Sequence, residues 1–236
     1  MCGICGVFSY DSNPGVQGPV RAMNAQMTHR GPDQDGFLFD GPIGLGHRRL
    51  SIIDLEGGKQ PIPDEGKRIW AMLNGEIYNF RELRRDLEGR HRFRTESDTE
   101  VLVHLYEEKK EAFVELLNGM FALAIWDSRE ETLLLARDRL GIKPLYYAEQ
   151  PERFLFASEI KALIASPWVD PQVRNESVYA FLRLKYVPGS DTIYRGIRRL
   201  EPGTLLRVRR DGITRRRYWQ IPPVQAAPRK VSRVAE

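Results

Sequence analysis

The second residue of the chain offers the most specific chemistry. The sequence begins Met1-Cys2, and removal of methionine before a small residue would leave Cys2 with a thiol and a free α-amine on one residue. An α-amine titrates near pH 8 and a thiol near pH 8.5, so at neutral pH part of the amine is neutral and can accept the thiol proton. Cys2 is therefore predicted to be a nucleophile with its own base, although this dipeptide alone would also suit a small buried residue.

An enzyme that attacks a carbonyl also needs donors for an oxyanion and charged groups for the substrate. Three short segments offer them, namely His47 to Asp54, Asn74 to Asn79, and Ser97 to Glu100. Each has an ordinary structural explanation. The first could carry solvated arginines, the second a two-residue hairpin turn, and the third a helix N-terminus with favourable acidic residues.

The cysteines and histidines suggest no other chemistry. Cys2 and Cys5 are too few for a disulfide framework, and as half of a zinc site they would need two more ligands. The four histidines are scattered without metal-ligand spacing, so no metal is expected. A redox C-x-x-C pair stands where a strand enters a helix, whereas residues 2–9 are typical of a strand.

The elements that must position these residues follow from hydrophobic spacing and turn residues. Strands are predicted at 2–9, 37–40, 43–47, 69–73, 121–127, 132–137, 145–148 and 154–157. Helices are predicted at 16–28, 80–87, 98–108, 158–165 and 177–184. Adjacent strands joined by short turns, with helices between the groups, predict an α+β fold with largely antiparallel sheets.

The composition of the 236 residues is that of a soluble globular protein, with 42% hydrophobic and 29% charged residues. The longest apolar runs are far short of the roughly 20 residues of a membrane helix, and no secretory signal is recognisable. We therefore expect a cytoplasmic protein with no membrane association.

The end of the chain is strongly basic, because residues 195–236 hold 12 Lys and Arg against 3 Asp and Glu. Clustered arginines can bind nucleic acid or acidic lipid. Here they alternate with apolar residues around Asp211-Gly212, which favours a hairpin with one polar face. The prediction is a structural hairpin and no nucleic-acid partner.

Taken together, the motifs carry a resemblance. Six segments occur in order: Cys2-Gly3-Ile4, Arg30-Gly31-Pro32-Asp33, His47-Arg48-Arg49-Leu50-Ser51-Ile52, Asn74-Gly75-Glu76-Ile77-Tyr78-Asn79, Ser97-Asp98-Thr99-Glu100 and Asn118-Gly119-Met120-Phe121-Ala122. They resemble the glutaminase domain of class II glutamine amidotransferases. Three later segments, at 137–147, 156–163 and 186–189, are similar to the asparagine synthetase branch.

The resemblance implies an N-terminal-nucleophile hydrolase fold, a four-layer αββα sandwich over residues 1–220, with a linker or disordered tail at 221–236. It implies that Cys2 forms a γ-glutamyl thioester, while Asn74 and the Gly75 backbone hold the oxyanion. Arg49 would bind the α-carboxylate of glutamine. Asp98 would bind its α-ammonium, and Glu76 would line the same pocket.

Two further expectations concern what the chain would work with. The Ser-Gly-Gly-x-Asp-Ser loop that binds pyrophosphate in asparagine synthetases does not occur, and Gly57-Gly58-Lys59-Gln60 lacks the spacing of a P-loop. We therefore expect no cofactor in this chain, with ATP and Mg²⁺ in a separate synthetase domain. The chain would be a fragment of a longer synthetase or a free-standing subunit, the fragment being favoured, and a homodimer is one arrangement it allows.

Three alternatives stay open at this point. The chain could belong to another class II amidotransferase, or be a degenerate module that only binds a partner. It could also be an N-terminal amidohydrolase for another amide, although such an enzyme would have no reason to hold both Arg49 and Asp98. If ammonia is passed onward, the apolar strand around Phe121 and Ile125 is the expected exit.

Overall fold

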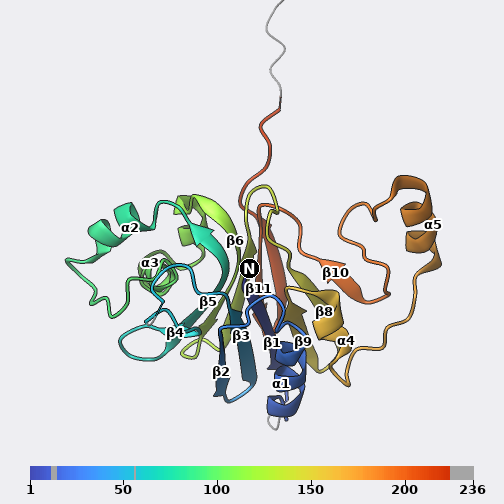
Figure 1. The fold of residues 1–236 in the computed structure, drawn as a ribbon, viewed down its shortest axis with the longest axis horizontal. Helices are drawn as coiled ribbons and strands as arrows, with labels where there is room; N and C mark the ends of the chain where they lie inside the picture. Colours follow the sequence, from blue (N-terminus) through green and yellow to red (C-terminus); the bar gives the residue numbers. More distant parts are fainter. Residues whose placement is uncertain (12–14, 56, 224–236) are drawn as a thin grey trace, which may run out of the picture.

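Two six-stranded antiparallel sheets form the centre of the computed structural model, which describes residues 1–11, 15–55 and 57–223 (Figure 1). The first sheet has the order β10 (Ile197–Arg199), β8 (Tyr146–Gln150), β9 (Arg153–Ala157), β1 (Gly3–Ser9), β3 (Ile43–Arg49) and β2 (Gln34–Asp40). The second has the order β12 (Gly212–Arg217), β11 (Thr204–Arg209), β7 (Thr132–Arg137), β6 (Gly119–Asp127), β5 (Ile69–Ile77) and β4 (Ile62–Pro63).

Side-chain alternation along the strands builds the layers. On β6, Ala122, Ala124 and Trp126 pack into the core between the two sheets, where Ile4 and Phe8 of β1 meet them. The intervening residues of β6 belong to a second core on the outer face of the same sheet. This period of two is what a strand buried on both faces requires.

Helices cover the two outer faces. α1 (Gln17–Ala25) and α4 (Ile160–Ile164) pack on the first sheet. α2 (Phe80–Leu87), α3 (Glu100–Lys109) and the 3-10 helix η1 (Lys110–Leu116) pack on the second. The order of layers is therefore helix, sheet, sheet, helix, which confirms the predicted α+β sandwich. α5 (Asn175–Leu184) lies apart from these layers at one edge of the molecule (Figure 1).

The predicted elements are present, with different ends. β5 continues to Ile77 and β3 to Arg49, so the polar residues expected just after these strands lie within them. In particular, Asn74 and Gly75 do not form a hairpin turn, because they pair with Ala122 and Phe121 of β6. The short strands β4 and β10 and the helix η1 were not predicted.

The basic hairpin is confirmed by the antiparallel pairing of β11 with β12. Several of its arginines contact carboxylates of neighbouring elements, in the pairs Arg207 with Glu111, Arg210 with Glu131, Arg216 with Glu115 and Arg217 with Glu201. Among the described residues, no helix is long and apolar enough to cross a bilayer. The tail predicted at 221–236 lies outside the described residues from 224 onward.

Candidate active site

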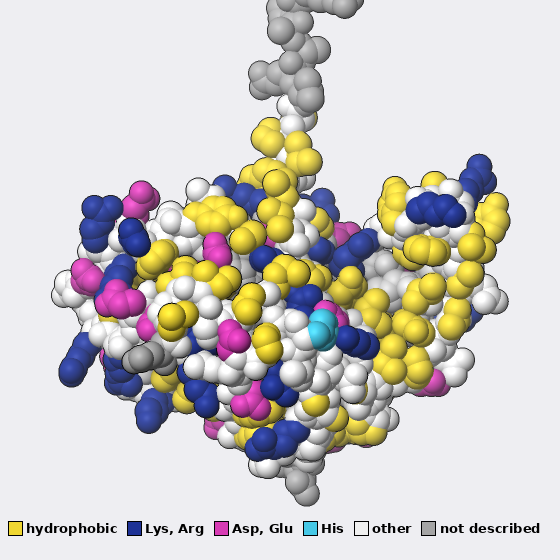
Figure 2. Space-filling model, viewed as in Figure 1, with side chains coloured by type: hydrophobic (Ala, Val, Ile, Leu, Met, Phe, Trp, Pro, Cys, Tyr) yellow, Lys and Arg dark blue, Asp and Glu magenta, His cyan; other side chains and the backbone are white. Residues whose placement is uncertain are grey.

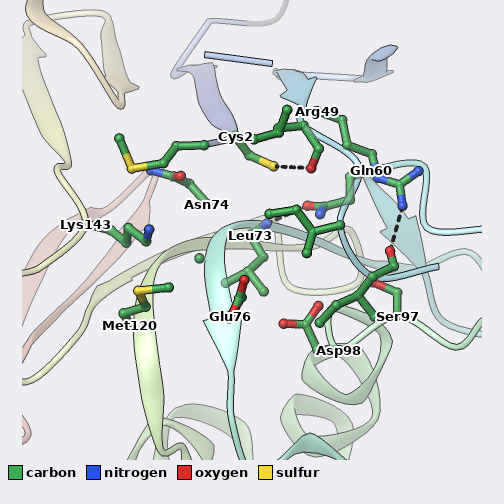
Figure 3. Close-up of a pocket in the computed structure, with 15 residues that line it drawn as sticks. Cys2, Arg49, Gln60, Leu73, Asn74, Glu76, Ser97, Asp98, Met120 and Lys143 are labelled. Atoms are coloured by element: carbon green, nitrogen blue, oxygen red, sulfur yellow. Dashed lines mark hydrogen bonds between the residues drawn. The ribbon is translucent and has the colours of Figure 1, made fainter. Parts of the chain in front are cut away.

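A cavity of about 190 Å³ opens where β1, β3 and β5 end near one another (Figure 3). Its lining includes all six residues predicted for the site: Cys2, Arg49, Asn74, Gly75, Glu76 and Asp98. Residues separated by up to 96 positions in the sequence thus share one wall. Pockets for drug-sized ligands are larger, at about 300–1,000 Å³, so this cavity suits a ligand the size of an amino acid.

The thiol of Cys2 faces the cavity. Its Sγ lies 3.7 Å from the carbonyl oxygen of Leu50, which can accept the S–H. Burial raises the pKa of this thiol above its ordinary value, so the thiol is predominantly protonated at neutral pH and needs a base before it can attack. Met1, which precedes it, is exposed and also lines the cavity.

Cys5 has a different environment. It is fully buried in the core between the first sheet and α1, with its Sγ 4.0 Å from the carbonyl oxygen of Val20. Burial raises its thiol pKa strongly. Both cysteines are free thiols. The redox pair weighed from the C-x-x-C spacing is therefore not formed here, and Cys2 alone of the two can meet a ligand in the cavity.

The backbone of Cys2 is fixed by a second motif. Arg30 donates from Nε to the Cys2 carbonyl oxygen at 2.9 Å and pairs with Glu159 at 3.0 Å. Ser158 accepts the backbone N–H of Ile4 at its Oγ, 3.0 Å away. Segments 30–33 and 156–163 thus have a structural role in the site, because their side chains hold the first residues of β1 beside the cavity.

Arg49 is buried at the end of β3 and organises the loop that follows. Its guanidinium donates to the side-chain oxygen of Gln34 at 2.8 Å and to the carbonyl oxygens of Ile53 at 2.9 Å and Leu55 at 3.3 Å, and also to the Asp54 carbonyl. Its N–H groups thus hold the loop over residues 51–55, which forms one rim of the cavity. A substrate carboxylate at Arg49 would have to share or replace these carbonyl contacts.

Asp98 supplies a buried negative charge to the lining of the same cavity. Its Oδ2 accepts the backbone N–H of Ile77 at 2.9 Å, which connects the start of α3 to the end of β5. Burial and the nearby charge of Glu76 raise the pKa of this carboxyl to about 6. A cationic ligand group beside Asp98 would lower that pKa again, so the site favours an ammonium.

Asn74 and Gly75 lie side by side inside β5. The Asn74 side chain is fully buried, its Nδ2 lies 3.5 Å from Ser158 Oγ, and its Oδ1 has no hydrogen-bond partner among the described residues. A Cβ on Gly75 would stand 2.0 Å from the Met120 carbonyl oxygen. Glycine at position 75 therefore lets β5 and β6 approach closely beside the cavity.

Two further residues in the cavity wall were not predicted. Gln60 is buried and accepts the backbone N–H of Leu73 at 2.6 Å, immediately before Asn74. Lys143 is buried and points toward the cavity from the loop after β7 (Figure 3). Lys143 lies in segment 137–147, one of the segments that carry the family resemblance, and this membership could have indicated it as a site residue. No sequence feature indicated Gln60. The ammonia exit expected around Phe121 and Ile125 stays a prediction; both of these side chains pack on the helix side of β6.

Comparison with known proteins agrees with this geometry. A family model described as "Glutamine amidotransferase domain" matches residues 1–219. The chain is 40% identical over 240 residues to "Asparagine synthetase [glutamine-hydrolyzing] 1" of Bacillus subtilis, covering 98% of this chain and 38% of that protein. It is 43% identical over 165 residues to "Asparagine synthetase [glutamine-hydrolyzing] 3" of Arabidopsis thaliana, covering 69% of this chain and 28% of that protein.

Among solved structures, the glutamine phosphoribosylpyrophosphate amidotransferase of B. subtilis, complexed with ADP and GMP, matches with a TM-score of 0.66 and 21% identity. The match covers 92% of this chain and 49% of that one, and it supports the N-terminal-nucleophile hydrolase fold. The chain spans less than two fifths of the length of the asparagine synthetases named above. On the extent of the family match and the identity to these relatives, this chain belongs to the glutamine amidotransferase domain family.

Proposed function

We propose that this chain hydrolyses glutamine to glutamate and ammonia through a covalent thioester on Cys2, and that the ammonia serves an asparagine synthetase-like enzyme. The observation that carries the proposal is the convergence of Cys2 with a buried cation, Arg49, and a buried anion, Asp98, around one cavity of amino-acid size. Glutamine carries a carboxylate and an ammonium at one end and an amide at the other. The cavity offers a group of matching chemistry for each.

The chemistry needs Met1 to be removed, because an α-amine on Cys2 is the base that the raised thiol pKa calls for. The amine takes the thiol proton while Sγ bonds to the amide carbon. The same proton then passes to the departing nitrogen, so that the C–N bond breaks and ammonia leaves. Water adds to the thioester carbon, the S–C bond breaks, and glutamate is released with the thiol restored.

Asn74 and the backbone N–H of Gly75 are proposed to donate to the oxyanion formed in each addition. The site is buried, where such donors act in a low dielectric and are worth more than in water. Loss of one donor of this kind typically costs about 3–4 kcal/mol of transition-state stabilisation. The carboxylate and ammonium contacts of Arg49 and Asp98 would limit the reaction to free glutamine, since a residue within a peptide lacks both charges.

The ammonia is proposed to be consumed by a synthetase domain or subunit that uses ATP and Mg²⁺. The relatives are named as glutamine-hydrolysing asparagine synthetases and extend well beyond the matched region. α5 offers a surface for such a partner, because Tyr179, Phe181, Leu182 and Leu184 are all exposed on it (Figure 2). Exposed apolar side chains gathered on one short helix are typical of an interaction surface.

We propose a cytoplasmic location, because both cysteines are free and a reducing compartment keeps the proposed nucleophile as a thiol.

The proposed reaction is tested by measuring glutamate and ammonia together after adding glutamine to the processed chain. Equal amounts of both products are expected, with activity lost in Cys2→Ala and kept in Cys5→Ala. Full activity in Cys2→Ala would contradict the proposal, and so would binding of glutamine without turnover when the partner domain is present.

A further inference from the structure

A second cluster of ionisable side chains lies outside the active site, on the helical side of the second sheet. Glu65 comes from the turn between β4 and β5, His91 from the segment after α2, and His104 and Glu107 from α3. One ligand-type atom of each lies within 4.8 Å of the others. The spacing of three residues on α3 places His104 and Glu107 on one face of that helix.

His104 is the most informative member of this cluster. Its side chain is 1% exposed, and neither ring nitrogen has a hydrogen-bond partner within the described part of the chain. Nδ1 lies 3.6 Å from Glu65 Oε2 and Nε2 lies 3.9 Å from Glu100 Oε1, both beyond hydrogen-bond distance. Burying an imidazole without partners is costly, so this orphaned ring indicates a missing ligand.

His91 is already oriented as a metal ligand would be. Its Nε2 lies 3.1 Å from Glu108 Oε1, and Arg90 holds the same carboxylate at 2.6 Å. Its Nδ1 faces the cluster, 3.8 Å from Glu65 and 3.7 Å from Glu107. A histidine that donates from one ring nitrogen to a carboxylate presents a lone pair on the other, which is the usual arrangement around protein-bound metals.

We propose that Glu65, His91, His104 and Glu107 bind one divalent transition-metal ion, with Zn²⁺ the best match. Two imidazoles and two carboxylates are ligands that Zn²⁺ accepts in tetrahedral geometry. Bonds of about 2.0–2.2 Å place tetrahedral ligand atoms about 3.4 Å apart. The four ligand atoms lie within 4.8 Å of one another, so the side chains would have to close by up to about 1.4 Å around the ion.

The ion would be structural. Four protein ligands fill a tetrahedral zinc site and leave no position for a substrate. It would tie the β4–β5 turn and the segment after α2 to α3, whose first residues adjoin Asp98. The histidines are scattered in the sequence, and for that reason no metal was expected. The fold nevertheless brings His91 beside His104, with ring centroids 4.6 Å apart.

The test is a Zn²⁺ titration of the chain, without a histidine tag and stripped by a chelator, followed by calorimetry. A Cys2→Ala background removes the active-site thiol as a competing ligand. One ion per chain is expected, with a rise in Tm on binding. Cobalt should give the visible absorption of a tetrahedral site. His104→Gln and Glu107→Gln should each weaken binding about 100-fold or more, because even outer contacts such as that of Glu108 are worth about 10–100-fold.

The matched control is His29→Gln, which removes another histidine paired with a carboxylate, Glu159 at 3.0 Å, far from the cluster. It should bind Zn²⁺ as tightly as its parent. Glu107 is only partly buried, so Glu107→Gln gives a folded variant even where His104→Gln does not. The proposal is overturned if stoichiometric binding is absent, if it depends on Cys2, or if Glu107→Gln and His29→Gln bind equally well.

Discussion

At the scale of single residues, the fold places two chemically identical side chains, the thiols of Cys2 and Cys5, in opposite environments. Cys2 stands at the start of β1 with its thiol in the cavity, whereas Cys5 is enclosed in the core beside α1. The sequence predicted the strand, and the position next to Met1 predicted which thiol reacts. Burial raises the pKa of the Cys2 thiol, and the groups around it, Leu50, Arg49 and Asp98, come from distant segments that no local pattern brings together.

Arg49 provides the first prediction at this scale. Arg49→Lys should raise the KM for glutamine about tenfold or more, because a lysine cannot replace the planar fork and hydrogen bonds to charged groups are worth about 1.5–3 kcal/mol. Arg48→Lys is the matched control, since Arg48 lies at the next position but contacts Asn24 and Asp35 instead. Equal KM values in the two variants, by steady-state kinetics, would remove Arg49 from the binding site.

Asp98 provides a prediction of pH dependence. Its carboxyl must be ionised to bind an ammonium, and its pKa is raised to about 6. The value of kcat/KM for glutamine should therefore fall about tenfold more for each pH unit below 6 than it does between pH 6 and 8, where only the neutral form of the Cys2 amine is being lost. A profile with no steeper fall below pH 6 would contradict the assignment.

Replacing Asp98 by asparagine separates its role in binding from its effect on stability. Because the folded-state pKa of Asp98 lies above its ordinary 3.8, its ionised form costs stability above pH 6 and that cost is relieved as the pH falls toward 4. Asp98→Asn should thus bind glutamine poorly but unfold, in denaturant at pH 8, at no lower concentration than the parent. A loss of stability in that variant would assign Asp98 a structural role instead.

At the scale of elements, residues of the candidate site lie at the ends of strands β3 and β5. The predicted ends of these strands were the least accurate part of the secondary-structure prediction. Asn74, Gly75 and Glu76 are poor strand formers, so the pattern ended β5 at residue 73. Pairing with β6 overrides that preference and extends the strand to Ile77. The apolar strands and amphipathic helices were predicted because their periodicity is local, whereas this extension depends on a neighbouring strand.

Gly75 gives the prediction for this scale. In Gly75→Ala, the new methyl group would meet the Met120 carbonyl oxygen and the Phe121 backbone, so β5 and β6 must separate. We expect a loss of about 1–3 kcal/mol in unfolding free energy, together with lower glutaminase activity. Gly89→Ala is the control, since its Cβ meets nothing within 4 Å. Denaturant unfolding that ranks the two variants equal would contradict the close approach.

At the scale of the whole molecule, α5 is set apart from the four layers and presents exposed aromatic and aliphatic side chains. If a synthetase domain docks there, backbone amides over residues 175–184 should exchange hydrogen more slowly in the assembled enzyme than in this chain alone. Mass spectrometry of hydrogen exchange measures this directly. Protection elsewhere on the surface with α5 unchanged would place the partner on another face.

The convergence of distant residues also sets the limit of sequence interpretation. The six predicted site residues were recognised because they stand in ordered motifs, and the fold brings all of them to one cavity. Gln60 was missed because a single buried glutamine gives no pattern. The cluster around His104 was missed because its members come from three segments that meet only after the helical layer has packed on the second sheet.

The most direct test is mass spectrometry of the processed chain after reaction with a glutamine-like electrophile. We predict a chain that begins at Cys2, with a single adduct on the Cys2 thiol whose formation free glutamine slows. An adduct on Cys5, or a chain in which Met1 is removed and Cys2 stays unmodified while glutamine is consumed, would contradict the claim that Cys2 is the nucleophile.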